Sequence, residues 1–416
     1  NDQNAIFTNK NNSSETINGY DVVMNERVTN EKGQYVNANN EVVTEDTQKI
    51  KYNDADWIIN EIQRGTFKKH RAADKMYLND MSKINSVVKE FTISTSTRGD
   101  LTLGLYVPAG EVVEITFSDE TWELIKNRKN AVSFVINQNM WNNYPKGDSG
   151  RISTRYPYIE TSFGANAIKG QSFQIGSPFG GGLSIFINSN ILKPGDIPLY
   201  SQIQDVSFTV SGAIPCLYYE DGITKRDEWF NQIKKVQENK LAPILQAWSP
   251  YFSLTIPFNG LNRIGGKDIN TLIYPNKSFK KWNDFLFLSN YLAGRDLSNS
   301  LTRLNMEFCD DVWGGAAAWG GGMTFYCPTS WANSIFGEEP SNVFNANNSW
   351  GVFHEINHNF EQNNAFFRRN THGETNQVTA FNLSIISDIT RFRNEINYTG
   401  ENVSNNYNNG WCYLDT

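Results

Sequence analysis

The chain is poor in histidine and cysteine and has no long apolar run. Four histidines and four cysteines occur in 416 residues. The cysteines are dispersed and form no CxxC pair, which argues against a disulfide scaffold and against a thiolate metal site. No apolar stretch approaches the roughly 18 to 20 residues that cross a bilayer, so we predict no transmembrane segment. The first ten residues also lack the apolar centre of a signal peptide.

Charge of one sign is not concentrated in any part of the sequence. Lysine and arginine together number 37 and aspartate and glutamate 44, which gives a formal net charge of -7. Because the basic residues are scattered, they offer no electrostatic footprint for a phosphate backbone or for an anionic membrane surface. We therefore expect no nucleic-acid partner.

The length and a change in hydrophobic periodicity predict an α+β multidomain protein. Residues 1–50 are polar and rich in asparagine, and we expect them to form a lead-in or linker. Residues 51–225 begin with a short helix near 55–66 and continue in short alternating runs, which predict an antiparallel β-sandwich-like domain. Residues 226–416 are predicted to be mainly helical, with one strand-like segment at 316–327.

The strand and helix predictions follow from particular segments of the sequence. The predicted strands are EFTISTST, LTLGLYVPAGEVVEITF, AVSFVINQ, QSFQIG, GLSIFIN, DVSFTVSG and AAAWGGGMTFYC. The predicted helices after residue 225 are KRDEWFNQIKKVQENKLAPILQAW, KKWNDFLFLSNYLAG, SWGVFHEINHNFEQ and NQVTAFNLSIISDITRF.

The segment HEINHNFE, residues 354–361, places two of the four histidines four positions apart with a glutamate between them. We predict a helix over about 348–362 with Ser349 or a neighbouring asparagine as its N-cap. His354 and His358 then share one face of the helix. The apolar face of the same helix is formed by Phe353, Ile356 and Phe360.

Two histidines at this spacing can both reach one zinc ion at about 2.0 to 2.1 Å. Glu355 lies at the flank of the pair, where its carboxylate can accept a proton from a water that the ion acidifies. This HExxH pattern predicts one catalytic zinc held by His354 and His358, with Glu355 as the general base. The alternative is a coincidental match on a solvated helix face, which is rare in so histidine-poor a chain.

A catalytic zinc needs a third protein ligand. We favour Glu374 because on a helix it heads an apolar stripe, where a buried carboxylate needs a cationic partner. The alternative for Glu374 is a glutamate stabilised by a helix N-terminus. Glu361 would have to reach round its own helix. His372 does not fit the HExxHxxGxxH spacing that recruits a third histidine.

The strand-like segment at 316–327 contains three consecutive glycines. Peptide substrates are often held against a strand edge, and glycines let a second backbone or a glycan approach closely. An ordinary glycine-rich turn into a core strand is the equal alternative. On the first interpretation the substrate-binding candidates are Trp319, Gly320, Gly321 and Gly322, together with His372.

With these features the sequence resembles the enhancin-like zinc metallopeptidases, the family of viral enhancins and bacterial mucin-degrading proteases. The resemblance spans roughly residues 60–410. It is carried by GLYVPAGEVVEITF at 104–117, SPFGGGLSIFI at 177–187, the glycine-rich strand, HEINH, and GET at 373–375. The resemblance implies a gluzincin, a metallopeptidase whose third zinc ligand is a glutamate downstream of HExxH.

By this resemblance His354, His358 and Glu374 correspond to the zinc ligands and Glu355 to the general base. Asn357 departs from the pattern, because the family often has glycine there. The resemblance implies a secreted or cell-surface enzyme that cleaves O-glycosylated proteins such as mucins and recognises host glycans together with peptide. We expect the catalytic domain to continue in a longer native chain. The candidates for stabilising the oxyanion are His372, Tyr398 and Tyr413.

Two other functions are compatible with the sequence. A glycan-binding adhesin with an inactive peptidase domain would use exposed aromatic rings to stack on sugars, for which Trp141, Trp313 and Trp319 are available. The intact Glu355 argues against this alternative. A broad-specificity protease of the thermolysin type would use the same zinc chemistry without dependence on glycans.

Overall fold

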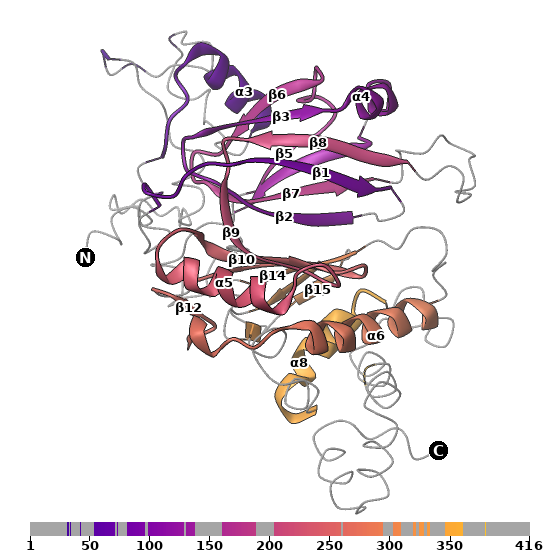
Figure 1. Cartoon of the computed structure of the whole chain (residues 1–416). Coiled ribbons are helices and arrows are strands. Elements are labelled where there is room, and N and C mark those ends of the chain that lie inside the picture. Colours follow the sequence, from indigo (N-terminus) through magenta and orange to yellow (C-terminus); the bar gives the residue numbers. More distant parts are fainter. Residues whose placement is uncertain are drawn as a thin grey trace, which may run out of the picture.

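The computed structural model shows a mixed α/β fold built around a ten-stranded sheet (Figure 1). It describes residues 31, 32, 34, 42, 54–70, 73, 81–95, 99–128, 130–137, 160–188, 204–258, 261–293, 303–308, 319–321, 324–327, 331–332, 346–360 and 379. A four-stranded sheet and a two-stranded ribbon accompany the large sheet. Within these described residues, no helix has the length and apolarity needed to cross a membrane.

The four-stranded sheet is antiparallel throughout. Its strands, in order across the sheet, are β1 (Val88–Ser94), β8 (Asp205–Ser211), β3 (Val112–Phe117) and β6 (Ser172–Gly176). Strand β3 buries alternate residues, as the apolar and polar alternation of its sequence predicts. Its buried side chains meet those of the large sheet in one shared hydrophobic core, so the two sheets pack face to face.

The large sheet combines segments from both halves of the chain. Its strands, in order across the sheet, are β15 (Trp319–Gly321), β16 (Thr324–Cys327), β14 (Leu304–Phe308), β11 (Phe252–Pro257), β10 (Ala242–Trp248), β9 (Ile214–Glu220), β2 (Gly99–Val107), β7 (Gly181–Ile187), β4 (Val132–Asn137) and β5 (Glu160–Phe163). Strands β9 and β10 pair in parallel, with Tyr218 beside Gln246. Hydrogen bonding therefore continues across residue 225, where the sequence predicts a domain boundary, and that boundary remains a prediction.

Helices α5 (Arg226–Gln237), α6 (Asn276–Leu292) and α8 (Ala346–Asn357) lie on the same side of the large sheet (Figure 1). They share a second core with β10, β11, β14 and β16. The predicted helix that begins at KRDEW is only partly correct, because it ends at Gln237 and residues 242–248 form strand β10. The half of the chain that was expected to be mainly helical thus supplies several strands of the sheet. The small ribbon pairs β12 (Arg263–Ile264) with β13 (Lys267–Asp268), followed by the 3-10 turn η5 (Ile269–Thr271).

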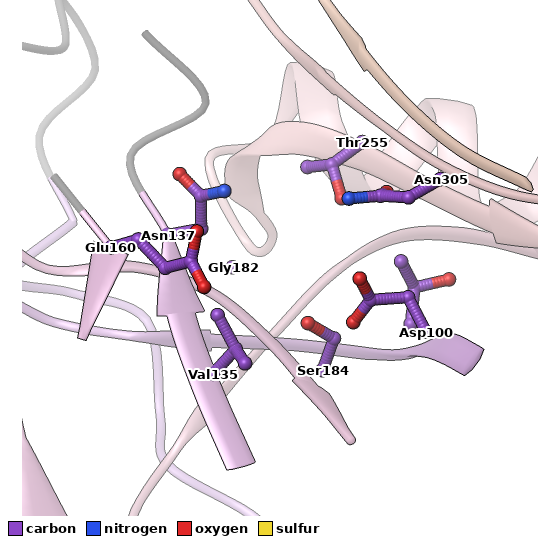
Figure 2. Close-up of a pocket in the computed structure, with 9 residues that line it drawn as sticks. Asp100, Val135, Asn137, Glu160, Gly182, Ser184, Thr255 and Asn305 are labelled. Atoms are coloured by element: carbon purple, nitrogen blue, oxygen red, sulfur yellow. The ribbon is translucent and has the colours of Figure 1, made fainter. Parts of the chain in front are cut away.

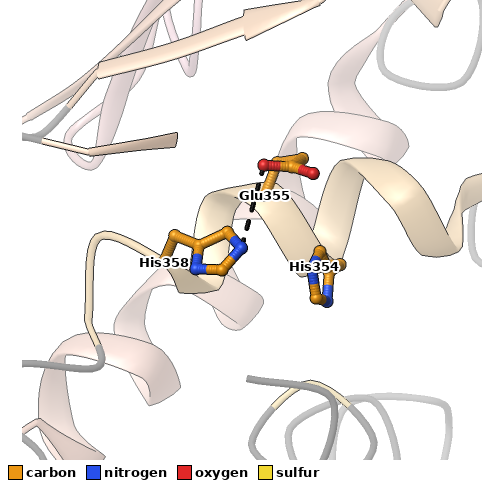
Figure 3. A group of neighbouring side chains, drawn as sticks. All are labelled: His354, Glu355 and His358. Atoms are coloured by element: carbon orange, nitrogen blue, oxygen red, sulfur yellow. Dashed lines mark ion pairs between the residues drawn. The ribbon is translucent and has the colours of Figure 1, made fainter. Parts of the chain in front are cut away.

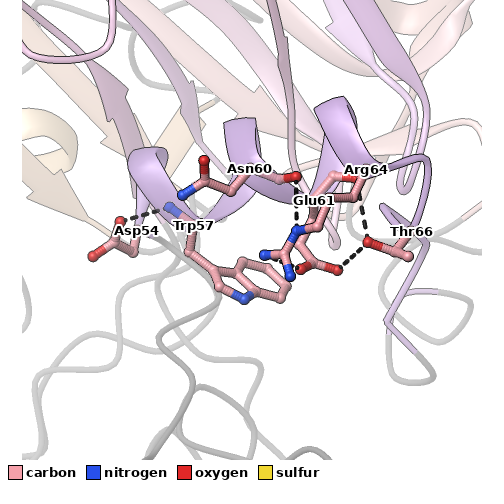
Figure 4. Close-up of polar contacts among 6 residues, drawn as sticks. All are labelled: Asp54, Trp57, Asn60, Glu61, Arg64 and Thr66. Carbon is pink, nitrogen blue, oxygen red and sulfur yellow. Dashed lines mark hydrogen bonds and ion pairs between the residues drawn. The ribbon is translucent and has the colours of Figure 1, made fainter. Parts of the chain in front are cut away.

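The short helix predicted near 55–66 is confirmed as α3 (Ala55–Arg64), and α4 (Asp119–Ile125) is a second short helix on the strand-rich side (Figures 1 and 4). The Asp54 carboxylate accepts a hydrogen bond of 3.0 Å from the Trp57 backbone N–H, which caps the start of α3. Gly65 ends the helix in the left-handed conformation, with φ of 69°. The Thr66 hydroxyl then donates to the Glu61 carboxylate over 2.7 Å, which holds the first residue after Gly65 against the helix.

A small polar cavity of about 30 Å³ lies where the large sheet curls, between β14 and β11 on one side and β2, β7, β4 and β5 on the other (Figure 2). Its lining includes Asp100, Glu160, Ser184, Thr255 and Asn305. Burial of the Asp100 carboxyl and the nearby Glu160 raise the pKa of Asp100 to about 7, although a hydrogen bond with Ser184 and the charge of Arg303 act in the opposite direction. Asp100 is therefore a titratable group inside the sheet.

Candidate metal centre

The HExxH segment lies at the C-terminal end of α8. The helix begins at Ala346, so the prediction that Ser349 or an adjacent asparagine is the N-cap is wrong: these residues form the first turns. The helix ends at Asn357, earlier than the predicted end near residue 362. The His358 N–H still donates to the His354 carbonyl over 3.3 Å, so the helical spacing of the two histidines is kept. The Phe360 N–H donates to the backbone carbonyl of Asn357 over 2.8 Å, which closes a tight turn after the helix.

The side chains of His354, Glu355 and His358 form a cluster at this helix end (Figure 3). One ligand atom from each lies within 4.8 Å of those of the other two. The two imidazole rings have their centroids 4.7 Å apart and their planes at 84°. The Glu355 Oε2 lies 3.9 Å from the His358 Nε2. Two imidazoles and a flanking carboxylate are thus brought together as the spacing predicts, in a donor set that suits zinc.

The cluster is partly accessible, whereas the opposite face of α8 is closed. His354 is 7% exposed, while the side chains of His358 and Glu355 are 16% and 18% exposed. Glu355 and His358 are therefore the more exposed members of the cluster. The predicted apolar face of the helix is confirmed, because its three members, Phe353, Ile356 and Phe360, are at most 1% exposed.

Two contacts that support α8 were not identified from the sequence. Gly351 lies so close to Trp331 that a Cβ on the glycine would stand 2.6 Å from the indole Cη2. Asn357 is fully buried and exchanges hydrogen bonds with Ser289 and Thr379. A glycine inside a helix and an asparagine within HExxH could have drawn attention to these contacts. Their partners could not be predicted, because they lie far away in the chain and belong to no motif.

Strand β15 lies at the edge of the large sheet, as far as the described residues show, and contacts α8. It pairs antiparallel with β16, with Trp319 opposite Tyr326 and Gly321 opposite Thr324. The backbone of the segment predicted to bind substrate therefore lies beside the helix of the histidine cluster. Both Gly320 and Gly321 belong to this edge strand.

Several predicted site residues lie outside the described part of the chain. They are Gly322, Glu361, His372, Glu374, Tyr398 and Tyr413. The assignment of the third zinc ligand and of the oxyanion-stabilising residue therefore remains a sequence prediction.

Solved structures that are similar to this chain include metallopeptidases of Clostridium perfringens. ZmpB metallopeptidase is 15% identical, with a TM-score of 0.48 over 69% of this chain and 53% of its own. The M60 catalytic domain of ZmpC in complex with the sialyl T antigen is 12% identical, with a TM-score of 0.48 over 72% of this chain and 57% of its own. The catalytic module of ZmpA is 15% identical, with a TM-score of 0.47 over 73% and 60%. The chain thus spans little more than half the length of these proteins.

Among curated proteins, none has a sequence that matches this chain significantly. Residues 212–416 match the family described as Peptidase M60, enhancin and enhancin-like. The matched region begins just before β9 and contains α5, α6, α8 and the whole histidine cluster. It also contains Glu374. Residues 212–416, the region that holds the histidine cluster, are therefore similar to the enhancin-like M60 peptidases.

Proposed function

We propose that the protein is a zinc metalloendopeptidase. The observation that carries this proposal is the cluster of His354, Glu355 and His358, whose ligand atoms lie within 4.8 Å of one another in the region that matches a peptidase family. Two imidazoles are suitable first ligands for zinc, and one carboxylate beside them is placed to handle a proton. The side chains present thus fit a single catalytic zinc ion.

Zinc bound in this position would supply Lewis acidity toward the scissile carbonyl and would make a water acidic enough to lose a proton near neutral pH. His354 and His358 would hold the ion through neutral imidazole nitrogens. Glu355 takes the proton from the attacking water and then delivers it to the nitrogen of the leaving amine. The C–N bond of the peptide breaks, and the oxygen of the water becomes part of the new carboxyl group.

We propose Glu374 as the third protein ligand. Its support is the apolar stripe that it heads in the sequence and the family match, which extends through this residue. A carboxylate from a second segment would complete the three protein ligands of a catalytic zinc and leave one position open for water.

We propose that the substrate lies along the edge of β15. This strand is adjacent to α8, and unpaired backbone groups at a strand edge can hydrogen-bond to an extended peptide. Gly320 and Gly321 add no side chain that would obstruct a bulky neighbour. Trp319, Gly322 and His372 complete the set of residues that we propose to contact substrate.

We propose that the substrates are O-glycosylated proteins of the mucin type. The proposal is supported by the sequence resemblance to mucin-degrading proteases, in particular by the segments at 104–117, 177–187 and 354–358. On this proposal the enzyme is secreted or displayed at the cell surface, where such substrates occur. We also propose that the strand-rich unit of residues 51–225 supports a peptidase unit of residues 226–416.

The experiment that tests this function uses one defined O-glycopeptide and the same peptide without sugar. The protein should cleave the glycopeptide at a peptide bond, leave the bare peptide intact, and lose activity when a chelator removes the metal. Equal cleavage of both peptides would instead indicate a thermolysin-like protease of broad specificity. Binding of the glycopeptide without any cleavage would indicate an adhesin with an inactive peptidase domain.

A further inference from the structure

Asn357, inside the HExxH motif, connects three segments of the protein. Its Oδ1 accepts a hydrogen bond of 3.3 Å from the Ser289 hydroxyl on α6. Its Nδ2 donates a hydrogen bond of 2.8 Å to the Thr379 hydroxyl oxygen. Asn357 and Thr379 are 0% exposed and Ser289 is 1% exposed, so water does not reach this junction.

Because the Asn357 amide is buried, it depends on both hydrogen-bond partners. A buried amide that lacks its partners loses the hydrogen bonds that it makes to water in the unfolded chain, so the junction is stable only when both partners are in place. The 2.8 Å bond to Thr379 is the shorter of the two, and it joins residues 22 positions apart. The side-chain amide of Asn357 thus fixes the distance between the end of α8 and Thr379.

This junction lies next to the histidine cluster. Asn357 directly precedes His358, whose ring belongs to the cluster. The His358 N–H donates to the His354 carbonyl over 3.3 Å, so the backbone that carries both rings includes the residue that the two side-chain bonds hold. Loss of the bond to Thr379 would therefore let the end of α8, and with it the His358 ring, shift relative to His354.

We propose that Asn357 is a positioning residue that, through Thr379, holds the end of α8 so that His358 keeps its place beside His354. This inference rests on the proposed zinc function. It assigns to Asn357 the task of setting the spacing of the two histidine ligands, not of contacting the metal or the substrate. The bond to Ser289 anchors the same amide to α6, while the bond to Thr379 ties it to a second helical residue.

The two bonds can be removed separately with matched variants of the full chain. Thr379→Val has nearly the same shape but removes the acceptor for Asn357, whereas Ser289→Ala removes only the bond to α6. The affinity of each metal-free variant for Zn²⁺ is measured by competition with a chelator of known affinity. Thr379→Val should bind Zn²⁺ about 10- to 100-fold more weakly than the wild type, the loss typical of removing a partner that orients metal ligands. Ser289→Ala should stay within about threefold, because the bond to Thr379 remains.

Thr379→Ser provides the control for a merely structural effect, since it keeps the hydroxyl and removes a methyl group from the core. Its affinity for Zn²⁺ should return to near the wild-type value even if its stability falls. An affinity of Thr379→Val equal to that of the wild type, or of Thr379→Ser as low as that of Thr379→Val, would overturn the proposal. Thr379→Ala replaces the valine variant if the latter does not fold, and it is judged by the same comparison.

A second readout separates positioning from loss of active protein. With saturating Zn²⁺, Thr379→Val should recover most of its kcat with little change in KM, because the ligands are weakened but the substrate site is intact. If the wild type itself binds no Zn²⁺, the proposed function fails, whatever the variants do. If the wild type binds Zn²⁺ tightly and Thr379→Val does so equally, only the positioning role fails.

Discussion

The ring of Phe353 is stacked on the indole of Trp282, with centroids 4.6 Å apart and planes at 25°. Phe353 lies on α8 directly before the HExxH motif, and Trp282 lies on α6, so this pair joins the candidate metal helix to its neighbour. Phe285 completes the contact with an edge-to-face approach of 4.8 Å. A substitution at position 353 therefore measures how strongly this packing holds α8 in place.

Replacing Phe353 with alanine should lower the free energy of unfolding by about 3 to 5 kcal/mol, because it leaves a cavity between two buried helices. Urea denaturation provides the measurement. The matched control is Phe287→Ala on α6, where the side chain is 43% exposed and the change should cost less than about 1 kcal/mol. Equal losses for the two variants would show that α8 is not held by this packing.

Gly351→Ala should destabilise the protein, although alanine favours helices more than glycine does. In an open helix the exchange would stabilise by about 1 kcal/mol. Here the new methyl group would stand 2.6 Å from Cη2 and 3.0 Å from Cζ3 of Trp331. We expect a loss of about 1 to 3 kcal/mol in the free energy of unfolding, since a close-packed core has no room for an added methyl.

A double variant identifies the cause of this loss. Trp331→Phe removes the outer ring of the indole, so Gly351→Ala should be less damaging in that background than in the wild type. The comparison needs the unfolding free energies of the wild type, both single variants and the double variant. Strict additivity of the two single changes would contradict the close contact as the explanation.

The two sheets differ in how far their strands could be predicted. Strands β1 and β3 face solvent on one side and a core on the other, so their sequences alternate and both fall in segments that were predicted as strands, although the segment of β3 was joined to that of β2. Strand β10 is buried along nearly its whole length. Its continuous apolar sequence has no period of two, so the prediction joined these residues to the preceding helix.

The end of α5 shows which signal was overlooked in that helix prediction. Asn239 adopts φ of 53°, in the left-handed region where asparagine is among the few residues other than glycine that are common. The Lys240 N–H donates back to the Lys235 carbonyl over 2.9 Å, which closes the helix. Asparagine in QENK was thus a stop signal, although weaker than glycine would have been.

Only the part of the candidate site that lies on a single helix could be predicted from the sequence. The four-residue spacing of His354 and His358 fixes their proximity, because consecutive helical turns superimpose them. The bonds of Asn357 depend on Ser289 and Thr379, which lie 68 and 22 positions away along the chain. Such partners are set by the packing of helices and cannot be read from a motif.

The raised pKa of Asp100 predicts a specific dependence of stability on pH. In the unfolded chain this carboxyl ionises near its ordinary value of 3.8, whereas in the folded protein it holds its proton up to about pH 7. Between these two values the folded state binds more protons, so the contribution of Asp100 to stability falls as pH rises, by up to about 1.4 kcal/mol per pH unit. Above pH 7 the group is ionised in both states and the contribution levels off.

Asp100→Asn removes this titration and leaves a group of the same size. The stability of the variant relative to the wild type should therefore increase from pH 5 to pH 7 and then stay constant. Urea denaturation of both proteins at half-unit pH steps provides the measurement. The surrounding charged groups, Glu160 and Arg303, are present in both proteins and cancel in the comparison. A difference that does not change with pH would contradict an Asp100 carboxyl that retains its proton.

Glu355→Gln should separate metal binding from catalysis. The amide keeps the size of the side chain and leaves both proposed imidazole ligands in place, so Zn²⁺ content by elemental analysis should equal that of the wild type. It cannot accept a proton from water, and kcat should fall by at least about 100-fold, the usual contribution of a general base. His358→Ala is the contrasting variant, because it removes a ligand and should lose both metal and activity. Glycopeptide cleavage by Glu355→Gln at the wild-type rate would show that another group moves the proton.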